Sequence, residues 1–454
     1  MEPRPRDKRL VGLSPSGSTT GRAIVIGPYL REETSGERGQ RSPQARLEEA
    51  VGLARAIDLE VAEAGIAPLA TIRPATYLGK GKVEEIAGLV KSLGAGLVVL
   101  DCALSPVQQR NLETAWSAKV LDRTGLILEI FGRRARTREG ALQVEHAHLT
   151  YQKSRLVRSW THLERQRGGF GFLGGPGETQ LEADRRLIEE RLARIEAELE
   201  KVKRRRKLHR ESRARVPFPI VALVGYTNAG KSTLFNRMTK SAVLEADMLF
   251  ATLDPTWRAV TLPNGLKVIL SDTVGFISDL PTMLVAAFRA TLEEVTEADI
   301  ILHVRDVAHE DTEAQARDVE HVLHELGIAP NDRRLITVWN KIDLLDEAER
   351  AQLANRAARA EADHRPVLIS ALTGEGLDRL ADAIERRLAS QRLTLDLILD
   401  PADGAGAGWL HRNTEVLAKA IRADGLLTFT VRVDPATAGL VRKKFGETAQ
   451  SRPS

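Results

Sequence analysis

The stretch FPIVALVGYTNAGKSTLFNRM, Phe218–Met238, indicates how the central part of the chain folds. It opens with an apolar run typical of a buried strand, passes through a G-x-x-x-x-G-K-S segment, Gly225–Ser232, and ends in an amphipathic helical pattern. Such a loop between strand and helix binds phosphate, because its glycines let backbone N–H groups wrap the anion. We therefore predict a nucleotide site on a doubly wound α/β sheet.

Two side chains of this loop have predicted chemical roles. Lys231 supplies positive charge to the β- and γ-phosphates, and Ser232 can ligate Mg²⁺. For Asn228 two interpretations stay open: a mark of GTPases that use K⁺ as a charge partner, or a loop-capping amide. The residues of the loop expected to contact the nucleotide are Gly225, Tyr226, Thr227, Asn228, Ala229, Gly230, Lys231, Ser232 and Thr233.

A second strand is predicted to end at the phosphates. LKVILSDTVGF, Leu266–Phe276, places Asp272 at the strand end, where its carboxylate can hold Mg²⁺ through water. Gly275 follows where its N–H can meet the γ-phosphate. At Phe276 many GTPases carry a glutamine that orients the attacking water, which phenylalanine cannot do. We therefore expect slow intrinsic hydrolysis that a partner accelerates.

Two later strand ends select the base. LITVWNKID ends in Asn340-Lys341-Ile342-Asp343, where Asp343 can accept two hydrogen bonds from guanine N1 and N2. Adenine does not offer these donors, so an ATP-filled pocket would leave the carboxylate unpaired. A further strand ends in Ser370-Ala371-Leu372, whose backbone can meet guanine O6. In this order the motifs predict a GTPase.

A switch threonine is expected in FATLDPTWRAVTLP, Phe250–Pro263. Thr252 is the best placed to sense the γ-phosphate and to ligate the metal beside Ser232, with Thr256 as the alternative. The predicted catalytic residues are Lys231, Thr252 and Gly275.

Composition bounds the remaining possibilities. A chain of 454 residues should form about three domains. Its apolar share of 43% is ordinary for a folded soluble protein, and no apolar run reaches membrane-spanning length. The single cysteine, Cys102, excludes an intrachain disulfide and suits a reducing compartment. We expect a cytoplasmic monomer that associates with ribosomes or peripherally with membrane.

Positive charge gathers in one part of the chain. Residues 133–215 hold 22 Lys plus Arg against 12 Asp plus Glu, while the formal net charge of the whole chain is +4. A basic segment between acidic parts indicates a polyanion contact, although a solvated helical face gives the same pattern. Apolar residues at helical spacing on either side of a central loop predict an antiparallel helical hairpin: Leu142, Leu149, Leu156, Leu163, then Ile188, Leu192, Ile195, Leu199 and Val202.

The loop between these helices reads GGFGFLGGPGE, Gly168–Glu178. It lacks the preceding strand that a phosphate-binding loop needs, so two interpretations remain, a flexible joint or an RNA-contacting tip. We favour the tip, because two aromatic faces suit unstacked bases. The residues expected to contact RNA are Gly168, Gly169, Phe170, Phe172, Gly174, Gly175, Arg204, Arg205 and Arg206.

Taken together, the motifs resemble the HflX family of ribosome-associated GTPases. The resemblance continues outside the GTPase motifs, in TYLGKGKVEEI (Thr76–Ile86), LSPVQQRNLE (Leu104–Glu113), IFGRRARTREGALQVEHAHLTY (Ile130–Tyr151) and GGPGETQLEADRRLI (Gly174–Ile188). It implies binding of GTP with Mg²⁺, a contact with the large ribosomal subunit near the peptidyl transferase centre, and splitting of stalled or idle ribosomes. The family's N-terminal part has been associated with ATP, which would make a weak second site.

The predicted fold class is α/β, in four parts. Residues 1–132 form a small α/β domain with a mostly parallel sheet, 133–215 the basic hairpin with its glycine-rich tip loop, 216–389 the GTPase domain and 390–454 a small α+β domain. Within the first part we expect a helix over 43–61 and a strand over 70–74. Within the last we expect a glycine-rich turn at 404–408 and a helix around 413–423.

Two other function classes remain open. One is a nucleotide-dependent RNA remodeller, using ATP or GTP, that works through the N-terminal domain. The other is a GTPase acting on a non-ribosomal protein partner.

Overall fold

The computed structural model describes residues 21–31, 41–166, 176–213, 218–240, 250, 256–278, 292, 294–391, 393–422, 424–433, 435–446 and 449–451. The chain divides into two compact units, Met1–Arg133 with Val144–Leu192, and Arg134–Gln143 with Ala193–Ser454. Thr252 and the loop residues Gly168–Gly175 lie outside the described residues.

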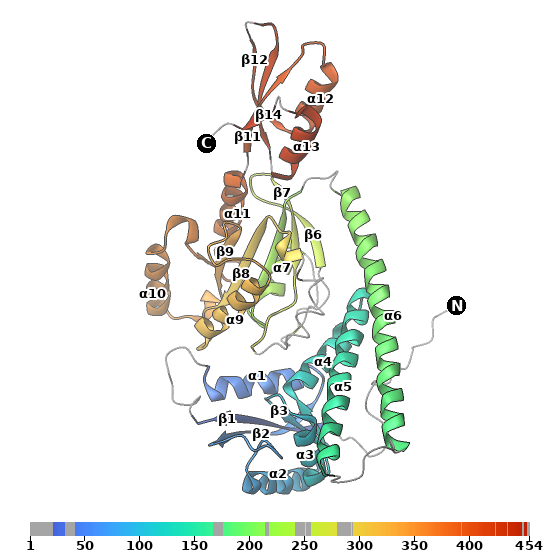
Figure 1. The fold of residues 1–454 in the computed structure, drawn as a ribbon. Helices are drawn as coiled ribbons and strands as arrows, with labels where there is room; N and C mark the ends of the chain where they lie inside the picture. The colour runs from blue at the N-terminus through green and yellow to red at the C-terminus, as the bar shows by residue number, and fades with distance from the viewer. Residues whose placement is uncertain are drawn as a thin grey trace, which may run out of the picture. The chain divides into compact units, whose positions relative to one another are not determined.

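The first unit is built on a parallel sheet of order β2-β1-β3-β4 (Figure 1). Strands alternate with helices along the chain, which supplies the crossover connections that parallel pairing needs. Ile24, Val98 and Leu100 of the sheet pack with Ile86 and Trp116 of the helices in one apolar core. The elements are β1 (Arg22–Leu30), α1 (Pro43–Arg55), β2 (Glu60–Leu69), α2 (Lys80–Leu93), β3 (Leu97–Leu100), α3 (Pro106–Trp116), β4 (Lys119–Asp122) and α4 (Arg123–Arg134).

Two expected elements of this unit are wrong in their bounds. The helix expected over 43–61 ends at Arg55, because Asp58 adopts a left-handed conformation with φ 59° and turns the chain. The strand β2 therefore begins at Glu60 and pairs with β1 over its length, ahead of the segment 70–74 where the strand was expected. Pairing with a neighbouring strand outweighs the helical propensity of its alanines.

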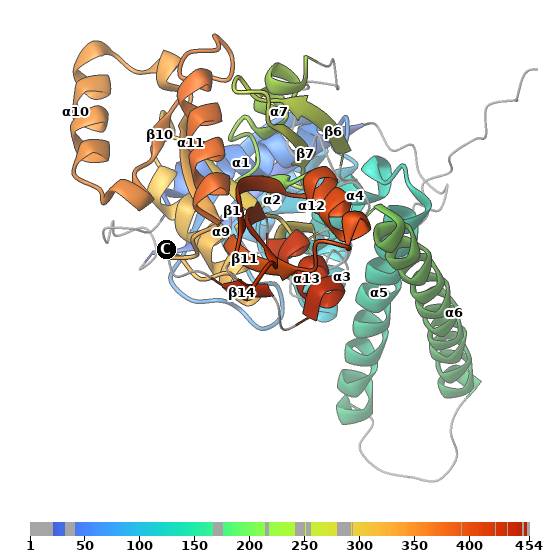
Figure 2. The same cartoon turned by 90° about the horizontal axis from the view of Figure 1, so that it is seen from above.

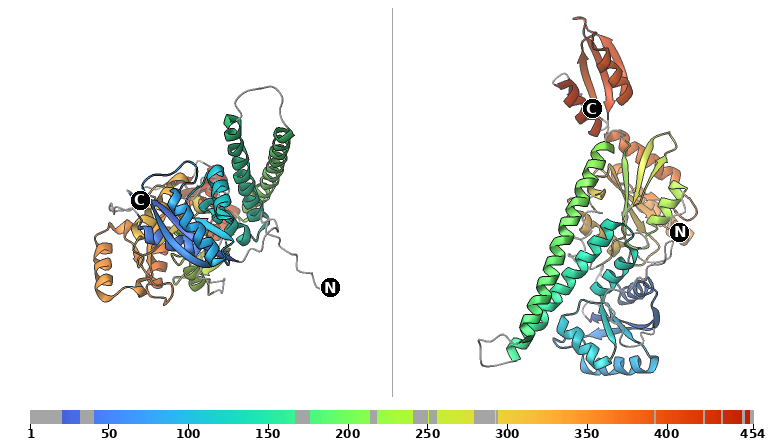
Figure 3. Two further views of the ribbon diagram at one scale, coloured as in Figure 1. Left: turned by 90° about the horizontal axis from the view of Figure 1, so that it is seen from below. Right: turned by 90° about the vertical axis from the view of Figure 1, so that its right-hand side faces the viewer.

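The helices α5 (Arg138–Gln166) and α6 (Pro176–Arg213) form the expected hairpin (Figures 2 and 3). Ion pairs join Glu145 to Arg191 at 2.7 Å, and Arg138 to Glu198 at 3.0 Å. As the residue number rises on one helix it falls on the other, so the helices are antiparallel. Of the predicted apolar seam, Leu142, Leu192 and Ile195 are buried.

The GTPase-type sheet of the second unit has the order β10-β9-β8-β5-β7-β6, with only β6 antiparallel. α7 and α11 pack on one face of the sheet in an apolar core that includes Leu223, Leu302 and Ile384. The elements are β5 (Ile220–Gly225), α7 (Lys231–Thr239), β6 (Thr256–Thr261), β7 (Lys267–Asp272), β8 (Ile300–Asp306), α9 (Thr312–Glu325), β9 (Leu335–Asn340), η1 (Ile342–Leu344), α10 (Glu347–Ala358), η2 (Ala362–His364), β10 (Val367–Leu368) and α11 (Leu377–Gln391).

The last part of the chain is an antiparallel sheet of order β12-β13-β11-β14 that shares an apolar core with α12 and α13. Its elements are β11 (Leu393–Leu399), α12 (Gly404–Asn413), β12 (Glu415–Ile421), β13 (Leu427–Val433), α13 (Pro435–Phe445) and β14 (Ala449–Ser451).

Two expectations for this part are wrong. The glycine-rich segment at 404–408 is the start of α12, since the Asp403 carboxylate caps it by accepting the N–H of Gly406 at 2.7 Å. The expected helix around 413–423 is instead strand β12, because pairing with β13 decides its conformation.

The predicted fold class is confirmed: a parallel α/β unit, a helical hairpin, a doubly wound P-loop sheet and a small α+β module follow one another in the expected order. The four-part division with its boundaries stays a prediction. None of the described helices combines the length and the apolar character needed to cross a membrane.

Candidate nucleotide-binding site

The carboxyl ends of the central sheet carry most of the predicted site residues. β5 ends at Gly225, β7 at Asp272, β8 at Asp306 and β9 at Asn340, while Ser370 follows β10. Because these strands are parallel, their carboxyl ends meet at one edge, where doubly wound sheets bind their ligands. The fold thus brings together motifs that lie up to 145 positions apart in the sequence.

The loop between β5 and α7 has a backbone that only glycine permits at two positions. Gly225 has φ 153°, and a Cβ there would collide with the carbonyl oxygen of Val304 on β8. Gly230 has φ 89°, and a Cβ there would collide with the side-chain amide of Asn340. The two glycines therefore allow the loop to lie directly against the neighbouring strands.

Lys231 begins α7 and turns back onto the loop. Its Nζ donates to the carbonyl oxygens of Tyr226 at 2.7 Å and Gly225 at 3.1 Å. Burial lowers the pKa of Lys231 from 10.5 to about 8, against the opposing attraction of Asp272. A phosphate anion bound at the loop would offset this penalty, because a neighbouring negative charge stabilises the charged ammonium.

Ser232 and Asp272 present two oxygen ligands side by side. The Ser232 hydroxyl donates to Asp272 Oδ2 at 2.9 Å, and the Asp272 side chain is buried. Oxygen donors of this type suit Mg²⁺, which prefers hard ligands. The pair therefore fits the predicted metal position.

Gly275 lies against the phosphate loop. A Cβ on Gly275 would stand 3.1 Å from Lys231 Nζ and 2.9 Å from Thr227 Cγ2. Any larger residue would thus crowd the lysine, so the backbone of Gly275 lies close to the ammonium group of Lys231.

Asn340 and Asp343, both predicted to lie at the base-binding end of the site, have different surroundings. The Asn340 side chain donates to the Ala229 carbonyl at 2.8 Å and accepts the N–H of Ala371 at 2.9 Å, so it joins two loops. The Asp343 Oδ1 atom is buried and has no hydrogen-bond partner among the residues that the structure describes. Such an orphaned acceptor fits the N–H donors of guanine.

Neighbouring residues complete this part of the site. Lys341 has left-handed φ 68° and forms an ion pair of 2.7 Å with Asp306. Ser370 and Ala371 are buried, whereas Leu372 is 67% exposed. The Leu372 side chain is therefore an exposed apolar surface and is not packed in the core.

The other predicted residues are placed as follows. Asn228 is exposed and has left-handed φ 59°, while Thr233 is half-buried on α7. Thr256 is the first residue of β6, opposite Asp272 in the adjoining strand. Arg204 is exposed on α6, and Arg205 and Arg206 continue that helix.

Sequence reasoning missed three polar residues of this region. Asp306 holds Lys341, and Ser278 and Asp318 hydrogen-bond to each other at 2.6 Å beside the phosphate loop. The sequence does carry a signal for Asp306, because a carboxylate at the end of an apolar, buried strand is a candidate site residue. Ser278 and Asp318 have none, because only the packing of α9 brings them together.

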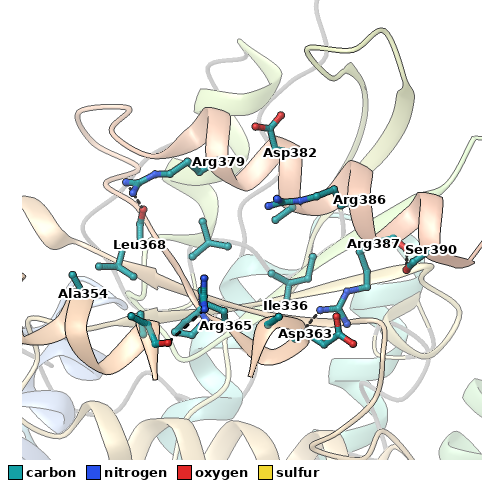
Figure 4. Close-up of a pocket in the computed structure, with 16 residues that line it drawn as sticks. Ile336, Ala354, Asp363, Arg365, Leu368, Arg379, Asp382, Arg386, Arg387 and Ser390 are labelled. Atoms are coloured by element: carbon teal, nitrogen blue, oxygen red, sulfur yellow. Dashed lines mark hydrogen bonds between the residues drawn. The ribbon is translucent and has the colours of Figure 1, made fainter. Parts of the chain in front are cut away.

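A cavity of 760 Å³ lies elsewhere in the same unit and contains none of the predicted site residues. Figure 4 shows Arg379 and Arg386 of α11 on one side of it, and Ile336 and Leu368 of the sheet on the other. It adjoins the beginnings of β9 and β10, at the end of the sheet away from the phosphate loop. The chemistry of the motifs, not the cavity, locates the nucleotide site.

The second nucleotide site expected in the N-terminal domain stays a prediction. The glycine–lysine run Gly79–Lys82 lies at the start of α2 in this domain. Its Lys82 pairs with Glu85 at 2.7 Å, and its Lys80 lies 3.8 Å from Glu84. At the carboxyl edge of that sheet, Arg123 pairs with Asp101 and Glu49, each at 2.5 Å.

A curated relative decides the family. GTPase HflX of Magnetococcus marinus is 48% identical over 413 residues, which cover 90% of this chain and 94% of the relative. The chain belongs to the HflX family. GTPase HflX of Escherichia coli is 45% identical over 382 residues, covering 82% and 88% of the two chains.

Family models cover most of this HflX chain. Their descriptions are GTP-binding GTPase N-terminal (residues 44–132), GTP-binding GTPase middle region (134–213), 50S ribosome-binding GTPase (220–341) and HflX C-terminal domain (354–454). Among solved structures, SsGBP in complex with GDP aligns with 80% of this chain and 97% of its own at a TM-score of 0.47 and 24% identity.

Membership of the HflX family confirms the predicted enzyme class. The chain is a GTPase that binds GTP. The roles assigned to the P-loop residues, Asp272, Gly275 and Asp343 in that activity stay predictions.

Proposed function

We propose that this HflX GTPase binds the large ribosomal subunit in its GTP-bound state and splits stalled or idle ribosomes. The supporting observation is the combination of a P-loop GTPase sheet with a long antiparallel hairpin in one chain. The hairpin is basic in sequence, and the family model over the P-loop is described as a 50S ribosome-binding GTPase. Basic charge supplies the attraction to ribosomal RNA that does not depend on sequence.

The chain's own residues account for nucleotide binding. Lys231 and the loop N–H groups bind the β- and γ-phosphates, Gly275 offers its N–H to the γ-phosphate, and Asp343 accepts from the guanine edge. Ser232, with Thr252 as the further predicted ligand, would hold Mg²⁺ directly, and Asp272 would hold it through water; the bound ion would neutralise phosphate charge.

The surroundings of Phe276 support the expectation that a partner accelerates hydrolysis. Its side chain is 1% exposed and packs inside the protein, and its backbone accepts the N–H of Thr227 at 2.7 Å. It therefore offers no polar group to an attacking water. We infer that the ribosome supplies or orders the group that holds this water.

The hairpin loop, Gly168–Gly175, is the proposed RNA-contacting tip, with the peptidyl transferase centre as its target. Arg204 and its neighbours on α6 provide further positive charge. K⁺ beside Asn228 and ATP in the N-terminal domain stay predictions, as do the RNA-remodelling and non-ribosomal alternatives.

Sedimentation of purified 70S ribosomes through a sucrose gradient tests the proposal. With a nonhydrolysable GTP analogue, the protein should convert 70S particles to subunits and travel with the large one, whereas with GDP it should do neither. An unchanged 70S peak in both states, with the protein at the top of the gradient, would favour a non-ribosomal partner.

A further inference from the structure

A tyrosine of the phosphate loop, Tyr226, is hydrogen-bonded to the segment that follows Gly275. The Tyr226 side chain is 4% exposed, and its hydroxyl lies 2.7 Å from Ser278 Oγ. The same hydroxyl oxygen accepts the backbone N–H of Ser278 at 2.9 Å. The Ser278 hydroxyl in turn lies 2.6 Å from Asp318 Oδ2 on α9.

Counting protons fixes the direction of this chain. A carboxylate only accepts, so the single Ser278 hydroxyl proton is donated to Asp318. Ser278 Oγ is then an acceptor toward Tyr226, and the Tyr226 proton must be donated to it. The chain runs from the buried Tyr226 through Ser278 to the half-buried carboxylate of Asp318, and hydrogen bonds that end on a charged group are stronger than isolated neutral ones.

Backbone hydrogen bonds also join the phosphate loop to the segment that follows Gly275. Thr227 N–H donates to the Phe276 carbonyl at 2.7 Å, and Phe276 N–H donates to the Gly225 carbonyl at 3.1 Å. These bonds form a parallel bridge between Tyr226 and Phe276. Gly275, one residue before the bridge, is thereby held against the phosphate loop beside Lys231.

We propose that the Tyr226–Ser278–Asp318 chain positions Gly275 for the γ-phosphate, so that it favours GTP over GDP and sets the rate of hydrolysis. The inference rests on the proposed contact between Gly275 and the γ-phosphate. Tyr226 is then a positioning residue, acting through the Ser278 backbone. GDP has no γ-phosphate, so a loosened Gly275 affects its binding little.

The first test compares Tyr226→Phe with wild type in the full-length protein. Affinities for GDP and for a nonhydrolysable GTP analogue are measured by calorimetry, together with kcat for GTP. Loss of the hydroxyl should weaken analogue binding by about 3- to 10-fold, the range for one buried hydrogen bond, and lower kcat. GDP affinity should stay within about twofold, since the phosphate loop itself is intact.

Tyr29→Phe is the matched control. Tyr29 is also buried, and its hydroxyl also donates one side-chain hydrogen bond, in this case directly to the carboxylate of Asp101 at 2.8 Å, but it lies on β1 outside the GTPase sheet. It should reproduce any general loss of stability without changing the ratio of the two affinities. Ser278→Ala interrupts the chain at its centre and should repeat the Tyr226→Phe result if that variant folds poorly.

The variant Gly275→Ala tests the contact between Gly275 and the γ-phosphate separately from the positioning role of Tyr226. Its Cβ should crowd Lys231 Nζ and weaken the GTP analogue. If Gly275→Ala binds the analogue like wild type, the γ-phosphate placement is wrong. If that variant is weakened while Tyr226→Phe and Ser278→Ala keep the wild-type ratio of analogue to GDP affinity and the wild-type kcat, the positioning role is wrong.

Discussion

The side-chain amide of Asn340 donates a hydrogen bond of 2.8 Å to the carbonyl oxygen of Ala229, across 111 positions of sequence. Its other end accepts the N–H of Ala371, so one side chain joins the phosphate loop to the loop after β10. Asn340 is therefore a structural link between the phosphate end and the base end of the site.

Asn340→Ala should destabilise the nucleotide-free protein. The change leaves buried groups of Ala229 and Ala371 without their partner, at a cost of about 1–3 kcal/mol. It should also weaken GTP and GDP by similar factors, because both nucleotides use the two loops. Chemical denaturation and calorimetry measure these effects, and a loss confined to GTP would contradict the linking role.

Asp343→Asn should change base preference. The amide replaces one acceptor with a donor, so GTP binding should weaken by about tenfold or more. Xanthosine triphosphate presents a carbonyl in place of the guanine amino group, so it should bind more tightly to Asp343→Asn than to wild type. Competition against a fluorescent nucleotide gives both affinities, and undiminished GTP binding would refute the base assignment.

Lys231→Met should abolish GTP binding while sparing the stability of the nucleotide-free protein. The pKa of Lys231 is lowered from 10.5 to about 8, so folding disfavours its charged form and burial of the charge costs stability below that pH. Between pH 8 and 10.5 the unfolded chain binds more protons than the folded one, so wild type should gain stability relative to Lys231→Met as pH rises through that window.

Urea unfolding of both proteins at about pH 7 and about pH 9.5, without nucleotide, measures this difference. A wild-type advantage that shrinks with rising pH would show that Lys231 is stabilising, against the burial argument.

Ribosomes should accelerate hydrolysis. Because Phe276 stands in place of a water-orienting glutamine, phosphate release by the isolated protein should be slow, and it should increase by at least about tenfold on adding large subunits. Small subunits alone serve as the control. Equal turnover in both mixtures would point to another partner.

Replacing Gly168–Gly175 by a Gly-Ser linker of equal length should separate the two activities. GTP affinity should stay at the wild-type value, because the P-loop is untouched, whereas ribosome splitting should be lost and ribosome binding weakened. A milder variant, Phe170→Ala with Phe172→Ala, tests the aromatic faces alone. If both variants split ribosomes at the wild-type rate, the segment is a flexible joint and not an RNA-contacting tip.

Much of the fold follows from local patterns in the sequence. The P-loop is a contiguous motif whose strand and helix are set by residues within 21 positions, so the sequence alone located it. The hairpin follows from a helical repeat over long segments, which is the most dependable local signal. Where local propensity and pairing disagree, as in Glu415–Ile421, pattern reading is wrong, because a strand is stabilised by a partner that lies elsewhere in the chain.

The chemistry is predictable from the motifs alone: Lys231, Asp272, Gly275 and Asp343, in this order, predict a GTP site without coordinates. The supporting groups emerge from the three-dimensional fold: they are the Asn340 side chain and the hydrogen-bond chain from Tyr226 to Asp318. These contacts join residues up to 111 positions apart, and they exist only because parallel strands deliver their ends to one edge and α9 packs beside it. Hydrogen bonding depends on that spatial meeting, which no short motif records.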